Sequence, residues 1–352
     1  TYHTKFDIDI ANAIHSKLLQ EASIRLLVEN IAACDEVWTV SRGAGENLRS
    51  LGYEGAYTVM PNGVDFPAGR VAESARQAVG AELDLPEDVP LLLFVGRIMW
   101  YKGLRIILDA LKRLKDEDVP FRMVFVGKGT DSREVQDYAR ELGLCGRVFF
   151  QPPCYDREVI RAWYCRADLF LFPSTFDTNG LVVREAAACG LASVLIEGSC
   201  AAEDVTDGRN GFFIEENAAS MAAKLAELCR APETMRIVGE NAQRELYVSW
   251  ETAVERAMAR YEVVIDNYRS GKYPRHERFG DGFFKTQGEL MELLAGVGEL
   301  QDEIAAGLER ERREAEQGFA RSCAEMQELL RGTKQEFSEL YRTLLQKMDR
   351  YL

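Results

Sequence analysis

The chain has 352 residues, of which 47% are apolar and 28% charged, and its formal net charge at pH 7 is −14. This length accommodates two domains, or one large domain with an extension, and the composition is that of an ordinary globular protein. The acidic balance disfavours nucleic-acid binding and argues, more weakly, against broad docking on anionic lipid. No apolar run reaches the roughly 18 residues of a membrane-spanning helix.

The eight cysteines are scattered, with no CxxC pair and no Cys/His spacing typical of a metal site. Several lie in apolar or alanine-rich runs, where cysteine packs as a small hydrophobic residue. This usage favours a reducing cytoplasm and predicts no metal site. Cys189 is a candidate nucleophile, but no histidine is near it in sequence, so a packing role is the preferred interpretation.

Residues 1–66 have the pattern of the end of a domain. A helical stretch with spaced apolar positions covers 14–31, and strands are expected at 36–40 and 57–60 with a helix at 45–51 between them. Two short strands cannot form a stable sheet by themselves. We therefore expect the remnant of a domain whose earlier part is missing, with a divergent, naturally short protein as the alternative.

Residues 67–249 predict an α/β domain. After a polar connection at 71–90, apolar strands and amphipathic helices alternate every 20 to 30 residues or so, as in consecutive βαβ units. Right-handed crossovers then give a doubly wound parallel sheet. Strands are expected at 91–95, 121–126, 147–151, 168–172, 193–196 and 211–214, and helices at 103–115, 131–142, 156–166, 181–189 and 218–230.

The loop after the first of these strands carries Gly96, Arg97 and Lys102, in the segment FVGRIMWYKGL. Because parallel strands present their carboxyl ends at one edge of the sheet, both cations are expected to reach the crevice there. Two cations beside a helix N-terminus suit a diphosphate, especially a leaving diphosphate that gains negative charge. A solvated pair at a helix start is the alternative, and it is less favoured because cations there oppose the helix dipole.

The most informative stretch runs from 168 to 198. A buried strand at 169–172 ends in a polar, Gly-containing loop, and a helix begins at Leu181. Unpaired backbone N–H groups and the positive end of the helix dipole therefore face one point, which suits a phosphate. Two carboxylates, Asp177 and Glu185, flank that point. A phosphate cradle bracketed by acids predicts a nucleotide-sugar site.

A helix is expected at 250–270, and the character of the chain changes after it. Apolar residues recur at close to heptad spacing between 326 and 348, and a charged run, ERERREAE, precedes them. We predict that 271–352 forms a helical or coiled-coil extension that self-associates or packs on the body. A lipid-binding amphipathic helix with peripheral membrane contact is the less favoured alternative, because the segment is acidic and interrupted by glycines.

The stretch around Asp177 and Glu185 resembles the donor-binding segment of retaining glycosyltransferases of family 4, which have the GT-B fold. That family usually carries two glutamates separated by seven residues, with a Gly-Leu pair between them. Asp177 stands here in place of the first glutamate, which keeps the charge, shortens the reach and leaves the sugar preference open. The family also has an arginine and a lysine at the spacing of Arg97 and Lys102. The resemblance covers roughly 1–268, with 250–270 as the helix that crosses back to the first domain.

The resemblance implies roles for these residues. Arg97 and Lys102 would bind the diphosphate, Glu185 the ribose hydroxyls, and Asp177 the transferred sugar. His3, in TYHT, corresponds to a histidine that faces the donor sugar in the family, although a position so near a chain end holds a side chain poorly. The other implied donor contacts are Gly96, Gly127, Lys128, Pro153, Thr178, Asn179, Gly180, Leu181 and Val182.

The activity implied by the resemblance is retaining transfer of a hexose from a nucleotide diphosphate sugar to an acceptor hydroxyl, with no cofactor and no required metal. UDP-glucose is expected from family frequency alone, and the acceptor, whether glycan, lipid or small molecule, is not specified by the sequence. A nucleotide-sugar epimerase or hydrolase of the same fold is one alternative. A non-catalytic binding module is another, because a chain without most of its acceptor-side domain is expected to bind donor whether or not it transfers the sugar.

Overall fold

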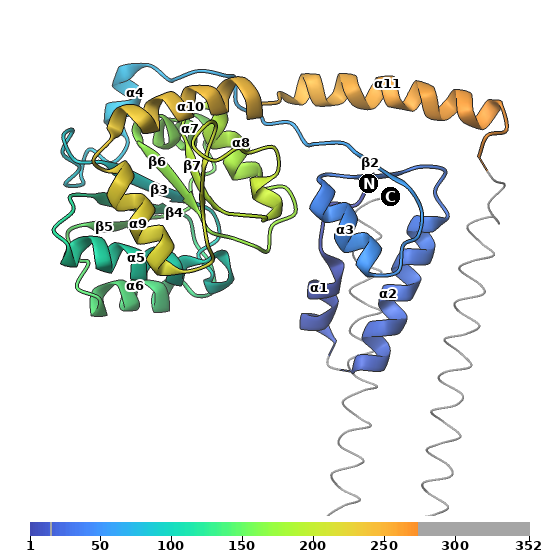
Figure 1. Ribbon diagram of the computed structural model, residues 1–352, viewed down its shortest axis with the longest axis horizontal. Coiled ribbons are helices and arrows are strands. Elements are labelled where there is room, and N and C mark those ends of the chain that lie inside the picture. The colour runs from blue at the N-terminus through green and yellow to red at the C-terminus, as the bar shows by residue number, and fades with distance from the viewer. Residues whose placement is uncertain (15, 274–352) are drawn as a thin grey trace, which may run out of the picture. The chain divides into compact units, whose positions relative to one another are not determined.

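The computed structural model describes residues 1–14 and 16–273 (Figure 1). The chain divides into two compact units. Unit 1 consists of residues 1–3, 38–46 and 57–266, and it contains the whole of the predicted nucleotide-binding domain. Of the described residues, unit 2 contains 4–37, 47–56 and 267–273. The predicted C-terminal extension lies, from 274 on, outside the described residues.

Unit 1 is built on a six-stranded parallel sheet with the order β5-β4-β3-β6-β7-β8. The order reverses at its centre, where β3 pairs with both β4 and β6. This arrangement confirms the predicted doubly wound sheet and puts a ligand-binding crevice at the carboxyl ends of β3 and β6. The strands are β3 (Leu91–Val95), β4 (Arg122–Val126), β5 (Val148–Gln151), β6 (Leu169–Phe172), β7 (Ser193–Ile196) and β8 (Phe212–Ile214).

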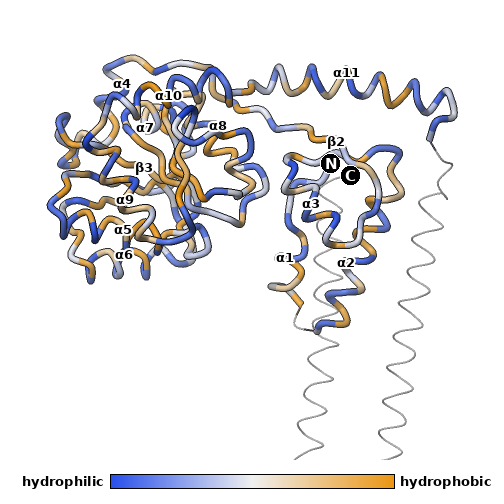
Figure 2. Tube along the Cα trace, in the orientation of Figure 1, coloured by the Kyte–Doolittle hydropathy of each residue, from blue (hydrophilic) through white to orange (hydrophobic). Residues whose placement is uncertain are grey.

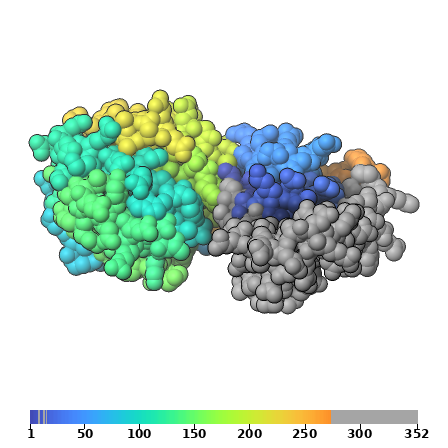
Figure 3. Space-filling view, turned by 90° about the horizontal axis from the view of Figure 1, so that it is seen from below, coloured from blue at the N-terminus to red at the C-terminus, as the bar shows by residue number. Residues whose placement is uncertain are grey.

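Helices cover both faces of the sheet (Figure 1). One layer contains α5 (Leu104–Asp116), α6 (Ser132–Glu141) and α9 (Ala218–Leu228), and the other contains α4 (Glu73–Ala78), α7 (Arg157–Arg166), α8 (Leu181–Ala188) and α10 (Pro232–Leu246). Figure 3, which views the molecule from below, shows a closed surface of side chains on the side of α5 and α6.

The core lies between these layers and the sheet. The central strands β3 and β6 are buried along their whole length, as expected for strands covered on both faces. Figure 2 shows the same apolar concentration along the sheet. The apolar face predicted for α5 packs into this core: Leu104, Ile107, Leu108, Leu111 and Leu114 are fully buried.

Local signals account for several helix boundaries. Asn217 caps α9, because its side chain accepts a hydrogen bond from the backbone N–H of Ser220. Pro232 occupies the first turn of α10, where its missing N–H costs nothing. The polar connection predicted at 71–90 contains the short helix α4, none of whose residues is buried. Because α4 has no buried face, its sequence shows no apolar periodicity from which a helix could be predicted.

The N-terminal region also differs from the expected single helix. Two helices form, α1 (Phe6–Ala13) and α2 (Lys17–Ala32), because the backbone is extended at Ile14 and Ser16. The next elements are β1 (Val37–Thr39), α3 (Arg42–Ser50) and β2 (Tyr57–Val59). β1 and β2 pair as a two-stranded sheet, and Tyr2 adds a parallel bridge at Thr39.

The last described helix, α11 (Trp250–Arg269), carries an apolar stripe. Trp250, Val254, Met258, Tyr261 and Ile265 lie three or four positions apart and are each at least 42% exposed. None of the helices within 1–14 and 16–273 combines the length and apolar composition needed to cross a membrane.

Candidate active site

A cavity of about 700 Å³ opens at the carboxyl ends of β3, β4 and β5. Five of the predicted site residues line it: Gly96, Arg97, Gly127, Lys128 and Pro153. The two cations among them, Arg97 and Lys128, come from different loops, whereas Lys102, which was expected beside Arg97, is not part of this lining. Tyr155 also lines this cavity with its side chain 89% exposed, and no pattern in the sequence had marked it.

Close backbone packing brings the first two loops together. A Cβ atom on Gly127 would lie 1.9 Å from the carbonyl oxygen of Gly96, and the φ angle of Gly127 is +147°. Any other residue would push the loops apart and enter a conformation that side chains disfavour. Glycine at this position therefore brings Arg97 and Lys128 to the same cavity.

Lys102 and Asp177 form a partly buried ion pair. Lys102 lies in a 3-10 turn (Trp100–Lys102) ahead of α5, and its Nζ lies 2.6 and 2.8 Å from the two Asp177 carboxylate oxygens. Ser174 Oγ donates to the same carboxylate at 2.6 Å. The Lys102 side chain is only 9% exposed, and its ammonium is 5.3 Å from the ring centre of Tyr101. Lys102, which was predicted to bind the diphosphate, and Asp177, which was predicted to bind the transferred sugar, are therefore paired with each other.

The contact between their two loops depends on Gly103. Its φ angle is +75°, and a Cβ atom there would lie 2.0 Å from the carbonyl oxygen of Pro173. The start of α5 thus lies against the backbone at the end of β6. This contact places the ammonium of Lys102 within reach of the loop that carries Asp177.

Glu185 on α8 is held by two side chains of α7. Tyr164 donates its hydroxyl to one carboxylate oxygen at 3.0 Å, and Arg157 approaches the other at 3.2 Å. Burial raises the pKa of Glu185, while Arg157 and Tyr164 act to lower it. Burial and the negative charge of Glu185 raise the pKa of Tyr164 well above its usual value, so its hydroxyl remains a donor. These partners could not be predicted from the sequence, because they come from a separate helix, α7, whose packing against α8 no local pattern contains.

The loop of the predicted phosphate cradle is anchored at Thr178. Its hydroxyl donates to the backbone carbonyl of His3 at 2.7 Å, and its carbonyl accepts from Ser41 Oγ at 2.5 Å. His3 thus contributes its main chain at this loop, whereas the resemblance implied a role for its imidazole. Thr178, an implied donor contact, lies on the loop before α8.

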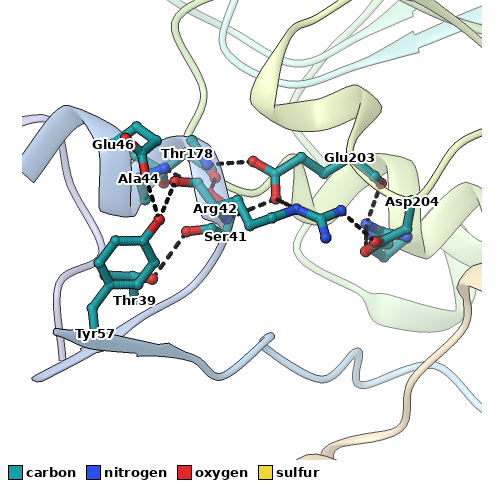
Figure 4. Close-up of polar contacts among 11 residues, drawn as sticks. Thr39, Ser41, Arg42, Ala44, Glu46, Tyr57, Thr178, Glu203 and Asp204 are labelled. Atoms are coloured by element: carbon teal, nitrogen blue, oxygen red, sulfur yellow. Dashed lines mark hydrogen bonds and ion pairs between the residues drawn. The ribbon is translucent and has the colours of Figure 1, made fainter. Parts of the chain in front are cut away.

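A carboxylate from further along the chain completes this anchor (Figure 4). Glu203 accepts hydrogen bonds from the backbone N–H groups of Arg42 and Gly43 in the first turn of α3. Ser41, which accepts from the N–H of Ala44, links the same turn to Thr178. A carboxylate at a helix N-terminus is stabilised by the exposed amides and by the helix dipole. The contact spans about 160 positions of sequence and was not predicted.

Asn179 and the start of α8 supply hydrogen-bond donors next to this loop. Asn179 is 6% exposed, and its Nδ2 is buried without a hydrogen-bond partner among the described residues. The helix begins at Leu181 after Gly180, with no side chain capping its first turn. Buried donors are nearly always paired in folded proteins, so an unpaired amide here points to a polar partner supplied from outside the chain.

Cys189 lies buried at the end of α8, with its sulfur 3.9 Å from the carbonyl oxygen of Arg161. A hydrogen bond with Cys165 and burial both raise its pKa, so the group is a thiol at neutral pH. This setting is that of a packed side chain and is unlike that of an activated nucleophile.

Residues 76–245 match the family described as "Glycosyl transferases group 1". Among curated relatives, the D-inositol 3-phosphate glycosyltransferase of Xylanimonas cellulosilytica is 33% identical over 195 residues, which cover 53% of this chain and 46% of the relative. The enzyme of the same name from Thermomonospora curvata is 32% identical over 277 residues, 72% of this chain and 64% of the relative. The chain therefore spans about half to two thirds of the length of these relatives.

Two solved structures show a similar fold. Anabaena Alr3699/HepE, crystallised with UDP-glucose, has a TM-score of 0.61 at 21% identity and covers 71% of this chain and 69% of its own. Sucrose-phosphate synthase from Thermosynechococcus elongatus also has a TM-score of 0.61, at 23% identity, and covers 73% and 65%. At this level of identity the likeness concerns the fold, and it confirms the predicted GT-B class.

Proposed function

We propose that this chain contains the donor-binding half of a retaining glycosyltransferase, which moves a hexose from a nucleotide diphosphate sugar to an acceptor hydroxyl. The observation that supports this most directly is the grouping of cations and acids at the switch point of the sheet. Arg97 and Lys128 line the cavity, Lys102 follows Arg97 on the loop after β3 and pairs with Asp177, and Glu185 lies in the second turn of α8. The family match over 76–245 supports the same reaction class.

The diphosphate of the donor would bind between Arg97, Lys102 and Lys128. Lys102 must then share its ammonium between Asp177 and a phosphate oxygen, which loosens the buried pair. As the glycosyl bond breaks, negative charge grows on the departing diphosphate, and preorganised cations stabilise that charge more than they stabilise the bound donor. The leaving group departs on the face from which the acceptor hydroxyl attacks, with no metal or cofactor taking part.

Asp177 and the first turn of α8 would hold the transferred sugar. The carboxylate, once it shares Lys102, can accept hydrogen bonds from sugar hydroxyls. The amide of Asn179 and the N–H groups at Leu181 and Val182 would donate to the sugar or to its phosphate. The unpaired Nδ2 of Asn179 thereby gains the partner that it lacks.

Glu185 would accept hydrogen bonds from the ribose, and the base would occupy the cavity lined by Pro153 and Tyr155. We propose UDP-glucose as the donor. The support is indirect: a structure of similar fold, Anabaena HepE, was solved with UDP-glucose.

The test is isothermal titration calorimetry of the chain with UDP, GDP, ADP and their glucose conjugates. We expect uridine nucleotides to bind, and Glu185→Ala to weaken that binding by about 10- to 100-fold, as for a lost hydrogen bond to a charged group. Glu141→Ala is the matched control, because this exposed glutamate on α6 lies away from the cavity. No binding of any nucleotide, or equal loss in both variants, would defeat the proposal.

Product analysis separates the remaining activities. An epimerase converts the donor without an acceptor, a hydrolase releases free sugar, and a binding module leaves the donor unchanged. Turnover that persists in EDTA supports transfer without a metal.

A further inference from the structure

A second cavity, of about 290 Å³, lies at the opposite end of the sheet from the donor crevice. Its walls include Asp168, which directly precedes β6, and Gly190, which lies between α8 and β7. The loops of the donor crevice follow the carboxyl ends of their strands, whereas Asp168 and Gly190 come before the amino ends of β6 and β7. The strand β6 separates the two sites by roughly 13 Å, given about 3.3 Å of rise for each of its residues. One ligand therefore cannot fill both cavities.

Arginines dominate the wall of this second cavity. Arg70 comes from the connection before α4, Arg76 from α4, Arg166 from the end of α7 and Arg236 from the first turns of α10. The lining also includes two carboxylates, Asp168 and Glu233. Cations thus outnumber carboxylates there, although the chain as a whole carries a net charge of −14.

The four arginines differ in how the protein holds them. The side chain of Arg70 is exposed and forms no hydrogen bond or ion pair with the described residues. Arg166 donates to the backbone carbonyl of Val79. Arg76 pairs with Glu73, three residues earlier on its own helix, and Arg236 pairs with both Glu233 and Glu240 on α10. Exposed pairs of this kind contribute little stability, so an added phosphate can compete for these guanidinium groups.

The arginine charges also contribute to the pKa shifts of two groups in this cavity. Burial and the nearby charge of Arg76 lower the pKa of Arg166, as expected where cations crowd together. Cys165 lies on the floor of the cavity, and its pKa is lowered to about 6 by a hydrogen bond from Cys189, with further contributions from the Val71 amide and the charges of Arg161 and Arg70. Even with a Cys165 thiolate counted, the lining keeps a positive charge.

We propose that this arginine cavity binds the phosphate group of a small soluble molecule, at a site separate from the donor crevice. Guanidinium groups form paired, charge-assisted hydrogen bonds with phosphate oxygens, and four of them arranged around one space suit a monoester or a diphosphate. The start of α10 adds a helix N-terminus on the same wall.

The test uses inorganic pyrophosphate and three single charge reversals in the full chain, at low salt to limit screening. Arg70→Glu reverses the unpaired cation of the cavity, Arg97→Glu reverses a cation of the donor crevice, and Arg113→Glu is an exposed control on α5. Calorimetry should show pyrophosphate binding that Arg70→Glu weakens by about ten-fold or more and that persists in Arg97→Glu. Arg113→Glu should bind as the wild type does.

Equal binding by Arg70→Glu and Arg113→Glu, each combined with Arg97→Glu, would overturn the proposal. Vesicles with and without phosphatidic acid form a second arm. Retention on phosphatidic acid that Arg70→Glu abolishes, together with no pyrophosphate binding, would assign the cavity to a lipid headgroup and so would also overturn it. Since Arg97→Glu tests the donor crevice independently, failure at one site does not imply failure at the other.

Discussion

Lys102 and Asp177 show how two predicted residues can be placed correctly while their relationship stays hidden in the sequence. Each lies near the carboxyl edge of the sheet, as expected from its position after a strand. Their ion pair, shielded from water, depends on the backbone contact at Gly103 and on the turn at Ser174. A charge pair of this kind is costly to break, because one partner is left buried and alone.

Lys102→Met should therefore lower the free energy of unfolding by about 2 kcal/mol or more, since Asp177 keeps a partly buried charge. The double variant Lys102→Met/Asp177→Asn should recover most of that loss, because no charge remains unpaired. If the proposed transfer takes place, both should lose more than about 100-fold in turnover. Urea denaturation and steady-state kinetics measure the two effects.

Lys112→Met provides the control, because Lys112 pairs with Asp116 on an exposed helix turn. Its unfolding free energy should change by less than about 0.5 kcal/mol. A Lys102→Met variant as stable as this control would show that the pair does not form.

Glu185 predicts a pH-dependent change. Because burial raises its pKa in the folded chain above the ordinary 4.5, its ionised form costs stability at neutral pH. Glu185→Gln removes that charge, and Tyr164 can still donate to the amide oxygen. The melting temperature of Glu185→Gln should therefore be at least that of the wild type at pH 7. This difference in melting temperature should vanish as the pH falls below 4.5, where Glu185 of the wild type is protonated in both the folded and the unfolded chain. A deficit at pH 7 would show that the bonds from Arg157 and Tyr164 outweigh the cost of burial.

At the level of elements, the sequence predicted the buried strands accurately and some of the helices less well. The strands at 91–95 and 193–196 match β3 and β7 residue for residue, because their apolar runs are too short for helices and are bounded by turn signals. The helix α4 was missed because it buries nothing, and the break between α1 and α2 follows no strong helix-stop signal. Partners such as Arg157 of Glu185 depend on how α7 packs on α8, which no local pattern contains.

Gly103→Ala should disrupt the junction of α5 with the end of β6. The substitution adds a clash with Pro173 to a left-handed backbone conformation. We expect a loss of about 3 kcal/mol, of which about 1 kcal/mol comes from the backbone conformation alone. Nucleotide binding should weaken in parallel because Lys102 is displaced, and calorimetry with UDP would measure this.

Gly146→Ala measures the cost of the left-handed backbone conformation without a steric clash. Gly146 has a φ angle of +78°, close to the +75° of Gly103, but nothing lies within 4 Å of its added Cβ. It should lose only about 1 kcal/mol in urea denaturation. Equal losses for the two alanine variants would mean that the helix can move away from the strand end at no cost.

At the scale of the whole molecule, the sequence predicts association through its C-terminal region. The heptad-like recurrence of apolar residues between 326 and 348 is typical of a coiled coil. Light scattering of the full chain should give a mass above that of a monomer, whereas a chain ending at 270 should not. Equal monomer masses would restrict the extension to packing on its own chain.

The apolar stripe along α11 has a practical consequence for stability measurements on this protein. Dyes that fluoresce on apolar surface bind exposed side chains such as Trp250, Met258 and Tyr261 while the chain is still folded. The fluorescence of such a dye would already be high before unfolding, so its increase during melting would be small. Trp163 is only 4% exposed and packs in the core of unit 1, so the change in its emission, separated from that of the other three tryptophans by substituting them, would report the loss of that core.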